Sequence, residues 1–242
     1  MIILPVEKKL RARVMLEVAD NVLKPSVAST SLLFAVKDKD IFDKTVFDIG
    51  SGTGYLGIGL MIRGANYLYA TDANLDACNL TLRNAGLNNI GDDKFECKCG
   101  EYDEPFNRYE QNGLENKIDT IISNPPLMPS RLSREEYGPN EATSTEDGSE
   151  SILKILEKAK YLLKKGGIIY FPIFNFSNPN KVKTFAEENF LSSVVATHDV
   201  IFDHNKLSQV DFFNAIYASG KGYSVEHQGH PYWRIEIMRC EK

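Results

Sequence analysis

The stretch Thr45-Val46-Phe47-Asp48-Ile49-Gly50-Ser51-Gly52-Thr53-Gly54 decides the fold. Residues 45–49 are a short apolar run rich in β-forming side chains, which predicts a buried strand. Glycine then recurs at alternate positions, and glycine permits positive φ angles and close approach of a ligand to the backbone. Residues 55–63 are apolar and predict a helix. A strand, a glycine-rich turn and a helix in this order are typical of a site for a nucleotide-type cofactor.

Strands and helices alternate outward from this stretch. We expect strands at 67–72, 95–98, 118–123 and 168–173, and helices at 74–85, ended by Gly86, and at 151–163. In the tail we expect a strand at 193–202, a helix at 207–218 and a final strand at 233–239. The fold class is therefore α/β, with a seven-stranded, mostly parallel sheet and an antiparallel C-terminal edge.

The N-terminal region follows a different pattern. Leu10, Val14, Val18 and Val22 are spaced by four residues, which predicts an amphipathic helix over 6–23. A loop at 24–31 and a short helix at 32–36 follow. We therefore divide the chain into a short helical extension, residues 1–43, and a main domain, residues 44–242. The apolar stripe could pack on its own core or on a second subunit, so the oligomeric state stays open.

Composition excludes several classes of protein. The chain has 242 residues, 43% hydrophobic and 25% charged, which suits one globular domain. Its apolar runs are too short to span a bilayer. The first residues place charges after a brief apolar stretch, the reverse of a secretory signal, so we expect a cytoplasmic protein. The four cysteines lack C-x-x-C spacing, which favours reduced structural thiols over a metal site.

Charge argues against non-specific nucleic-acid binding. The net charge is −5 and the sequence pI is about 5.5, whereas such binding relies on Lys and Arg that neutralise phosphates. Two basic stretches, at 8–13 and 154–165, are interpreted as solvated faces of helices.

The glycine-rich turn resembles the S-adenosylmethionine (SAM) loop of Rossmann-like methyltransferases in its Asp48-x-Gly50-x-Gly52-x-Gly54 phasing. Residues 52–57 also fit the dinucleotide pattern G-x-G-x-x-G. Asp72 ends the second strand, where a carboxylate can accept hydrogen bonds from two ribose hydroxyls or cap the next helix. The resemblance implies SAM as cofactor, bound by Asp48, Gly50, Ser51, Gly52, Gly54, Asp72, Ala73, Glu101, Tyr102 and Asn124.

A second motif, Ser123-Asn124-Pro125-Pro126-Leu127, directly follows the fourth strand. Two prolines make a stiff turn, and the amide oxygen of Asn124 and the carbonyl of Pro125 can accept hydrogen bonds from an –NH2 group. Over residues 45–175 the chain resembles the N-methyltransferases with Asn-Pro-Pro-aromatic motifs. These act on the glutamine amide of release factors or on base amino groups of DNA, rRNA and tRNA. The resemblance implies catalytic roles for Asn124, Pro125, Pro126 and Leu127, and no metal.

Further similarity and two departures qualify this resemblance. Residues 146–153 resemble the acidic Asp-Gly stretch of the glutamine-specific branch. Leu127 replaces the usual aromatic residue, which would stack on a flat acceptor; Tyr137, Phe174 or Phe176 could supply a ring instead. The region before residue 45 is also shorter than the N-terminal substrate domain of bacterial release-factor enzymes.

These features predict a SAM-dependent N-methyltransferase that acts on a planar amide or amino nitrogen, in a protein glutamine or an RNA base. The alternatives are an enzyme for a small-molecule amine, a non-catalytic SAM-binding subunit, and an NAD-dependent oxidoreductase, for which we find no catalytic constellation. Ser29, Thr30 and Ser31 either close over the cofactor or cap a helix. Segments 128–150 and 205–231 are candidates for acceptor recognition.

Overall fold

A twisted central sheet organises the molecule. The computed structural model describes residues 2–5, 13–107, 113–129 and 147–242. Within these, eight strands form the main sheet in the order β5-β4-β3-β6-β7-β10-β8, with β9 beside β10. The strands are β3 (Thr45–Ile49), β4 (Tyr67–Asp72), β5 (Phe95–Cys99), β6 (Ile118–Ile122), β7 (Leu163–Phe174), β8 (Leu191–Ile201), β9 (Val225–His227) and β10 (His230–Glu241).

The predicted sheet type is confirmed. β3 pairs in parallel with β4 and β6, β4 pairs with β5, and β6 pairs with β7. β10 pairs antiparallel with β7, β8 and β9, so the C-terminal edge is antiparallel. Seven strands lie on the main path, as expected, and the short β9 is the addition.

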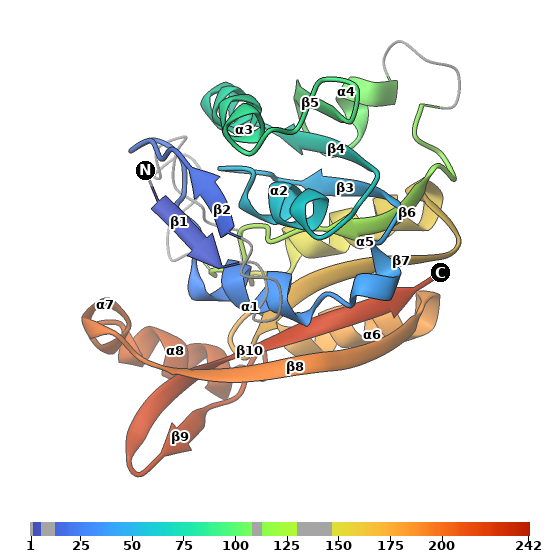
Figure 1. Ribbon diagram of the computed structural model, residues 1–242. Coiled ribbons are helices and arrows are strands. Elements are labelled where there is room, and N and C mark those ends of the chain that lie inside the picture. The colour runs from blue at the N-terminus through green and yellow to red at the C-terminus, as the bar shows by residue number, and fades with distance from the viewer. Residues whose placement is uncertain (1, 6–12, 108–112, 130–146) are drawn as a thin grey trace.

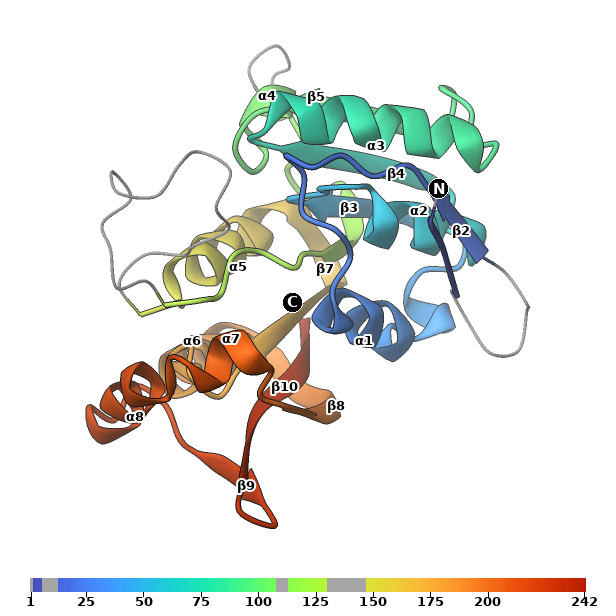
Figure 2. The same cartoon turned by 90° about the vertical axis from the view of Figure 1, so that its left-hand side faces the viewer.

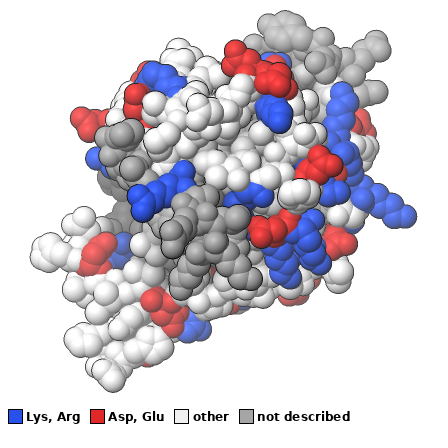
Figure 3. All heavy atoms as spheres, viewed as in Figure 1, with Lys and Arg blue, Asp and Glu red and all other residues white. Residues whose placement is uncertain are grey.

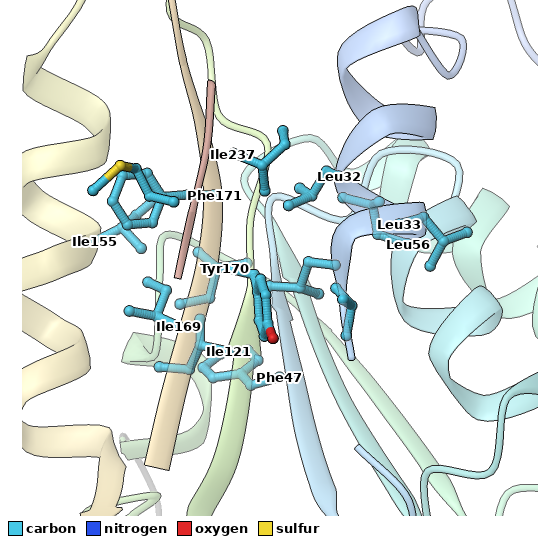
Figure 4. Packing of buried hydrophobic residues seen from close by; sticks show 14 of the residues in the cluster. Leu32, Leu33, Phe47, Leu56, Ile121, Ile155, Ile169, Tyr170, Phe171 and Ile237 are labelled. Carbon is cyan, nitrogen blue, oxygen red and sulfur yellow. The ribbon is translucent and has the colours of Figure 1, made fainter. Parts of the chain in front are cut away.

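Helices cover both faces of this sheet (Figure 1). Leu32 and Leu33 of α1 and Leu56 of α2 pack on one side, and Ile155 of α5 packs on the other (Figure 4). The sheet contributes fully buried side chains between them, among them Phe47, Ile121 and Tyr170. The α-helices are α1 (Val27–Ala35), α2 (Tyr55–Ile62), α3 (Leu75–Leu87), α4 (Glu104–Asn107), α5 (Glu150–Leu162), α6 (Pro179–Asn189), α7 (His204–Leu207) and α8 (Val210–Ala218); η1 (Asp38–Asp40) is a 3₁₀ turn.

The helix predicted over 6–23 is wrong wherever the structure describes it. Residues 13–16 form strand β2 (Arg13–Leu16), which pairs antiparallel with β1 (Ile2–Pro5); residues 6–12 lie outside the described residues, and so does most of the basic stretch 8–13. The side chain of Asn88 hydrogen-bonds the backbone of β2 as a neighbouring strand would. It accepts from Met15 N at 2.9 Å and donates to Met15 O at 2.8 Å. These tertiary contacts outweigh the helical preference that the four-residue apolar spacing indicates.

Several boundaries also differ from expectation. Helix α1 begins at Val27, inside the predicted loop, because Ser26 caps it. Gly86 lies within α3, and Asn89, with φ 58°, adopts the left-handed conformation just after the helix. The strand expected at 168–173 begins earlier, at Leu163, and its pairing with β6 changes register between Leu163 and Ile168, as at a bulge.

Helix α6 was not predicted. Pro179 occupies its first turn, a common helix-start signal, and Val182 and Ala186 are buried four residues apart. Both signals were present in the sequence.

The C-terminal strands extend past the rest of the sheet as an arm made of α7, α8 and β9 with the adjoining ends of β8 and β10 (Figure 1). Phe213 of α8 anchors the arm by packing against Phe176 and Phe202, with ring centroids 5.0 Å apart in each pair. In the face shown in Figure 3 the end of the arm is mainly uncharged, while elsewhere basic and acidic side chains are interspersed.

The described residues bear on the expectations about membrane spans and about the cysteines. None of the described helices is long and apolar enough to cross a membrane. All four cysteines are free. No group of three or more His, Cys, Asp or Glu suited to a metal ion occurs within the part of the chain that the structure describes.

Candidate functional site

The two sequence motifs meet at one edge of the sheet. β3, β4 and β6 are parallel neighbours, so their carboxyl ends lie side by side. The glycine loop follows β3, Asp72 ends β4, and Asn124 follows β6. This edge faces the viewer in Figure 2. Ligands of open α/β sheets bind at this edge.

The glycine loop has the backbone that the sequence predicted. Gly50, Gly52 and Gly54 have φ angles of 77°, 56° and 78°, which favour glycine. A Cβ on Gly54 would lie 2.8 Å from Ile58 Cδ1 and 3.0 Å from Thr81 Cγ2, so a side chain there would force Ile58 and Thr81 to shift. A Cβ on Gly50 would meet nothing within 4 Å. The loop therefore leaves open space at its start, where a ligand can approach the backbone.

Hydrogen bonds to neighbouring elements fix the loop. Gly50 N and Ser51 N donate to the Thr71 carbonyl at 2.8 and 2.9 Å. Thr81 Oγ1, on α3, donates to the Gly52 carbonyl at 3.0 Å. The loop is thus held from β4 and from α3, which preorganises it for binding.

Asp72 orders the same loop through its carboxylate. Its Oδ2 accepts from Gly52 N and its Oδ1 from Asn74 N, each at 2.9 Å. Burial raises the pKa of Asp72, and the two backbone hydrogen bonds oppose that shift. Each oxygen keeps a second lone pair, so the carboxylate can still accept from a pair of ribose hydroxyls. The helix cap is formed by the side chain of Asn74 and not by Asp72.

Asp48 lies beneath the loop and is fully buried. Its Oδ2 accepts from Gly57 N at 2.8 Å. Its Oδ1 has no hydrogen-bond partner among the described residues. Burial raises its pKa to about 7, the Gly57 hydrogen bond opposes this, and the charge of Asp72 adds to it. Asp48 therefore carries an electrostatic cost at neutral pH that a cationic ligand nearby would relieve.

The turn after β5 lies next to Asp72. Gly100 N donates to the Asp72 carbonyl at 2.9 Å, which brings residues 101 and 102 toward the end of β4. Glu101 is exposed, and Tyr102 is half-buried with φ 51°. Position alone is consistent with contact to a ligand on Asp72 and Ala73.

The Asn-Pro-Pro turn is tied to the end of β3 and to β7. Ser123 N donates to the Tyr170 carbonyl at 3.1 Å, and Ser123 Oγ donates to the Ile49 carbonyl at 2.6 Å. The side-chain amide of Asn124 then donates from Nδ2 to Ser29 Oγ at 2.9 Å. Pro125 is buried and Pro126 is exposed. Asn124 is consequently held directly beside the glycine loop.

Leu127 belongs to the core. Its side chain is 2% exposed, and its carbonyl accepts from Ser177 Oγ. We expected Leu127 among the catalytic residues, but its packing makes it an anchor for the turn. Phe176 is also fully buried among aromatic rings, and Phe174 packs edge-on against Trp233. Tyr137 lies outside the described residues.

The Asp-Gly stretch supports the same turn. A Cβ on Gly148, whose φ is 84°, would lie 2.6 Å from the Leu127 carbonyl oxygen. Asp147 accepts from Ser149, Asn178 and Lys181. Its pKa is about 2, because these hydrogen bonds and the Lys181 charge outweigh the effect of burial. Most of the recognition segment predicted at 128–150 lies outside the described residues.

Sequence reasoning missed the residues that hold the motifs in place. Thr81 and Ser177 carried no sequence signal, because each acts through a hydrogen bond to a residue far away in the sequence. Thr81 bonds Gly52, 29 positions away, and Ser177 bonds Leu127, 50 positions away. Asn84 links Glu17, at the N-terminal end of the chain, to Thr53 of the glycine loop.

The site suits an adenosyl cofactor. It offers open space over Gly50, a carboxylate with free lone pairs on Asp72, and a buried carboxyl group, Asp48, with one oxygen unpartnered among the described residues. With the Rossmann-like sheet, this arrangement defines the class: the protein is a SAM-dependent methyltransferase. The chain belongs to the methyltransferase small-domain family, whose model matches residues 24–206.

Two relatives of known name are similar to the chain in sequence. It is 31% identical over 146 residues to a Methanocaldococcus jannaschii protein provisionally named protein N5-glutamine methyltransferase, covering 59% of this chain and 68% of the relative. It is 35% identical over 136 residues to the release factor glutamine methyltransferase of Aquifex aeolicus, covering 52% of this chain and 45% of that enzyme.

A solved structure supports the fold. The ribosomal protein L11 methylase from Lactobacillus delbrueckii subsp. bulgaricus superposes with a TM-score of 0.52 at 15% identity, covering 89% of this chain and 80% of that one.

Proposed function

We propose that this methyltransferase transfers a methyl group to a planar amide or amino nitrogen, and that its acceptor is the glutamine amide of a protein. The observation that carries the proposal is the placement of Asn124-Pro125-Pro126 beside the glycine loop, at the carboxyl edge of the sheet. The relatives named as glutamine methyltransferases favour the amide over an RNA base. The net charge of −5 points the same way.

In this proposal the chain binds and orients both reactants. Asp72 accepts from the ribose hydroxyls, and residues 50–54, Ala73, Glu101 and Tyr102 surround the rest of the cofactor. Asn124 Oδ1 and the Pro125 carbonyl accept the two hydrogens of the acceptor –NH2, so that the nitrogen lone pair is directed at the methyl group. SAM supplies that methyl group already activated on a cationic sulfur. The nitrogen loses a proton to water after the new N–C bond has formed, so no general base is needed.

Two further statements are part of the proposal. We place the protein in the cytoplasm, where protein synthesis supplies such acceptors. We also keep the division into an N-terminal extension, residues 1–43, and a methyltransferase domain, residues 44–242.

The proposal is tested by tritiated-methyl transfer from SAM into a fractionated lysate, with Asn124→Ala as the matched variant. We expect label in the protein fraction, and a loss of turnover by orders of magnitude in the variant while SAM affinity persists. Label in RNA would show that the acceptor is an RNA base and not a protein glutamine. Label in small molecules alone would indicate a biosynthetic enzyme. An unchanged rate in Asn124→Ala would remove the assigned role of the motif.

A further inference from the structure

Helix α1 connects the two halves of the site. Its first turn carries Ser29, whose Oγ accepts from Asn124 Nδ2 at 2.9 Å. The next residue, Thr30, is hydrogen-bonded to the side chain of Tyr55, the first residue of α2 after the glycine loop. The helix therefore contacts both the acceptor motif and the cofactor loop.

The contact to Ser29 decides which end of the Asn124 amide is available. Nδ2 is engaged by Ser29 Oγ, whereas no described residue hydrogen-bonds Oδ1. Ser29 itself is 9% exposed, and its Oγ also accepts from Ser26 N at 3.3 Å. A buried hydroxyl that accepts from the amide nitrogen stabilises the orientation in which Oδ1 is left free for another donor.

We propose that Ser29 is a positioning residue, which orients the side chain of Asn124 so that Oδ1 accepts a hydrogen from the acceptor nitrogen. This inference rests on the proposed function. Without the hydroxyl, the amide of Asn124 can rotate and present Nδ2, a donor, to an –NH2 group that needs an acceptor. The misoriented fraction would then be unproductive, and the loss would fall on turnover.

A helix cap is the competing explanation, because Ser29 belongs to the capping box as well, and a variant of Ser26 separates the two roles. Ser26 is the N-cap, because its Oγ accepts from Ser29 N at 3.2 Å. The Ser29 hydroxyl completes the capping box by accepting from Ser26 N. Ser26→Ala therefore weakens the cap without removing the group that contacts Asn124, and it serves as the matched control.

The experiment compares Ser29→Ala, Ser29→Thr and Ser26→Ala in methyl transfer, SAM titration and thermal unfolding. We expect Ser29→Ala to lower kcat roughly 10- to 100-fold with SAM affinity within about 3-fold of the wild type. Ser26→Ala should lower the unfolding midpoint comparably but keep kcat within about 2-fold. Ser29→Thr keeps a hydroxyl and should recover most of the turnover.

A double-mutant cycle with Asn124→Ala makes the test independent of how well threonine fits. If Ser29 acts through Asn124, adding Ser29→Ala to Asn124→Ala should reduce the residual rate no further. Additive losses, or equal kcat values for Ser29→Ala and Ser26→Ala, would overturn the inference while leaving the methyltransferase assignment intact. Absence of transfer by the wild-type protein to any fraction would instead contradict the proposed function.

Discussion

At the residue scale, the glycine loop depends on the backbone of Gly54. Its φ of 78° strains any other residue, and a Cβ there would also force Ile58 and Thr81 to shift. We predict that Gly54→Ala destabilises the protein by about 1–3 kcal/mol and weakens SAM binding. Gly86→Ala is the control: this glycine is helical and a Cβ there would meet nothing within 4 Å. It should be neutral or stabilise by up to about 1 kcal/mol. Urea unfolding of both variants measures the difference, and equal losses would contradict the assigned strain.

Asp48 makes stability depend on pH. Its pKa is about 7 in the folded protein, raised by burial from an ordinary value of 3.8. Between pH 4 and pH 7 the folded state thus holds a proton that the unfolded state releases, so this group lowers stability as pH rises. Over the range from pH 5 to pH 8, Asp48→Asn should remove up to roughly 3 kcal/mol of that loss. The free energy of unfolding at pH 5 and pH 8 measures it, and an identical pH slope in the variant would refute the account.

At the scale of elements, β2 is held by α3 through two asparagine side chains. Asn88 exchanges two hydrogen bonds with the backbone of Met15, and Asn84 does the same with Glu17. We predict that Asn88→Ala costs about 2 kcal/mol and raises amide exchange in residues 13–16. The exposed Asn79 of the same helix provides the control, and Asn79→Ala should change neither quantity. Unaltered exchange in Asn88→Ala would show that β2 is held by other contacts.

The elements with local signals could be predicted from the sequence. β3, β4 and β6 are buried apolar runs with clear ends, and the sheet type followed from their alternation with helices. β2 was not predicted, because its four-residue apolar spacing is typical of a helix and two of its side-chain contacts come from more than 60 residues away, beside its pairing with β1. The motif residues at the carboxyl edge of the sheet could also be predicted, because each motif is recognised from a few consecutive residues. The burial of Leu127 depended on Ser177 and Gly148, which no local pattern links to it.

At the scale of the whole molecule, the arm and the active edge lie at the same end of the sheet. Ile235 of β10 pairs with Phe174, the last residue of β7, so residues 204–234 extend beyond the carboxyl ends of the parallel strands. Asp199, Arg234 and His227 brace the arm, with the Arg234 guanidinium 2.7 and 2.8 Å from the Asp199 carboxylate. This placement agrees with a role of residues 205–231 in acceptor recognition, which stays a prediction.

Leu207 tests that role. It is 46% exposed on α7. Leu191, 75% exposed, starts β8 at the other end of the sheet, away from the carboxyl ends of the parallel strands. We predict that Leu207→Gln raises the KM for a protein acceptor several-fold and leaves SAM affinity unchanged, because it alters only the acceptor surface. Leu191→Gln should change neither value. Equal KM values in the two variants would place acceptor recognition elsewhere.

The central claim is that residues at this edge bind SAM, and calorimetric titration tests it most directly. SAM and S-adenosylhomocysteine should bind the wild-type protein at micromolar concentration, and NADH should not. Asp72→Ala should weaken SAM binding at least 10-fold through loss of the ribose contact, whereas Asn124→Ala should weaken it by no more than about 3-fold. Binding of NADH in place of SAM, or undiminished SAM binding by Asp72→Ala, would contradict the account.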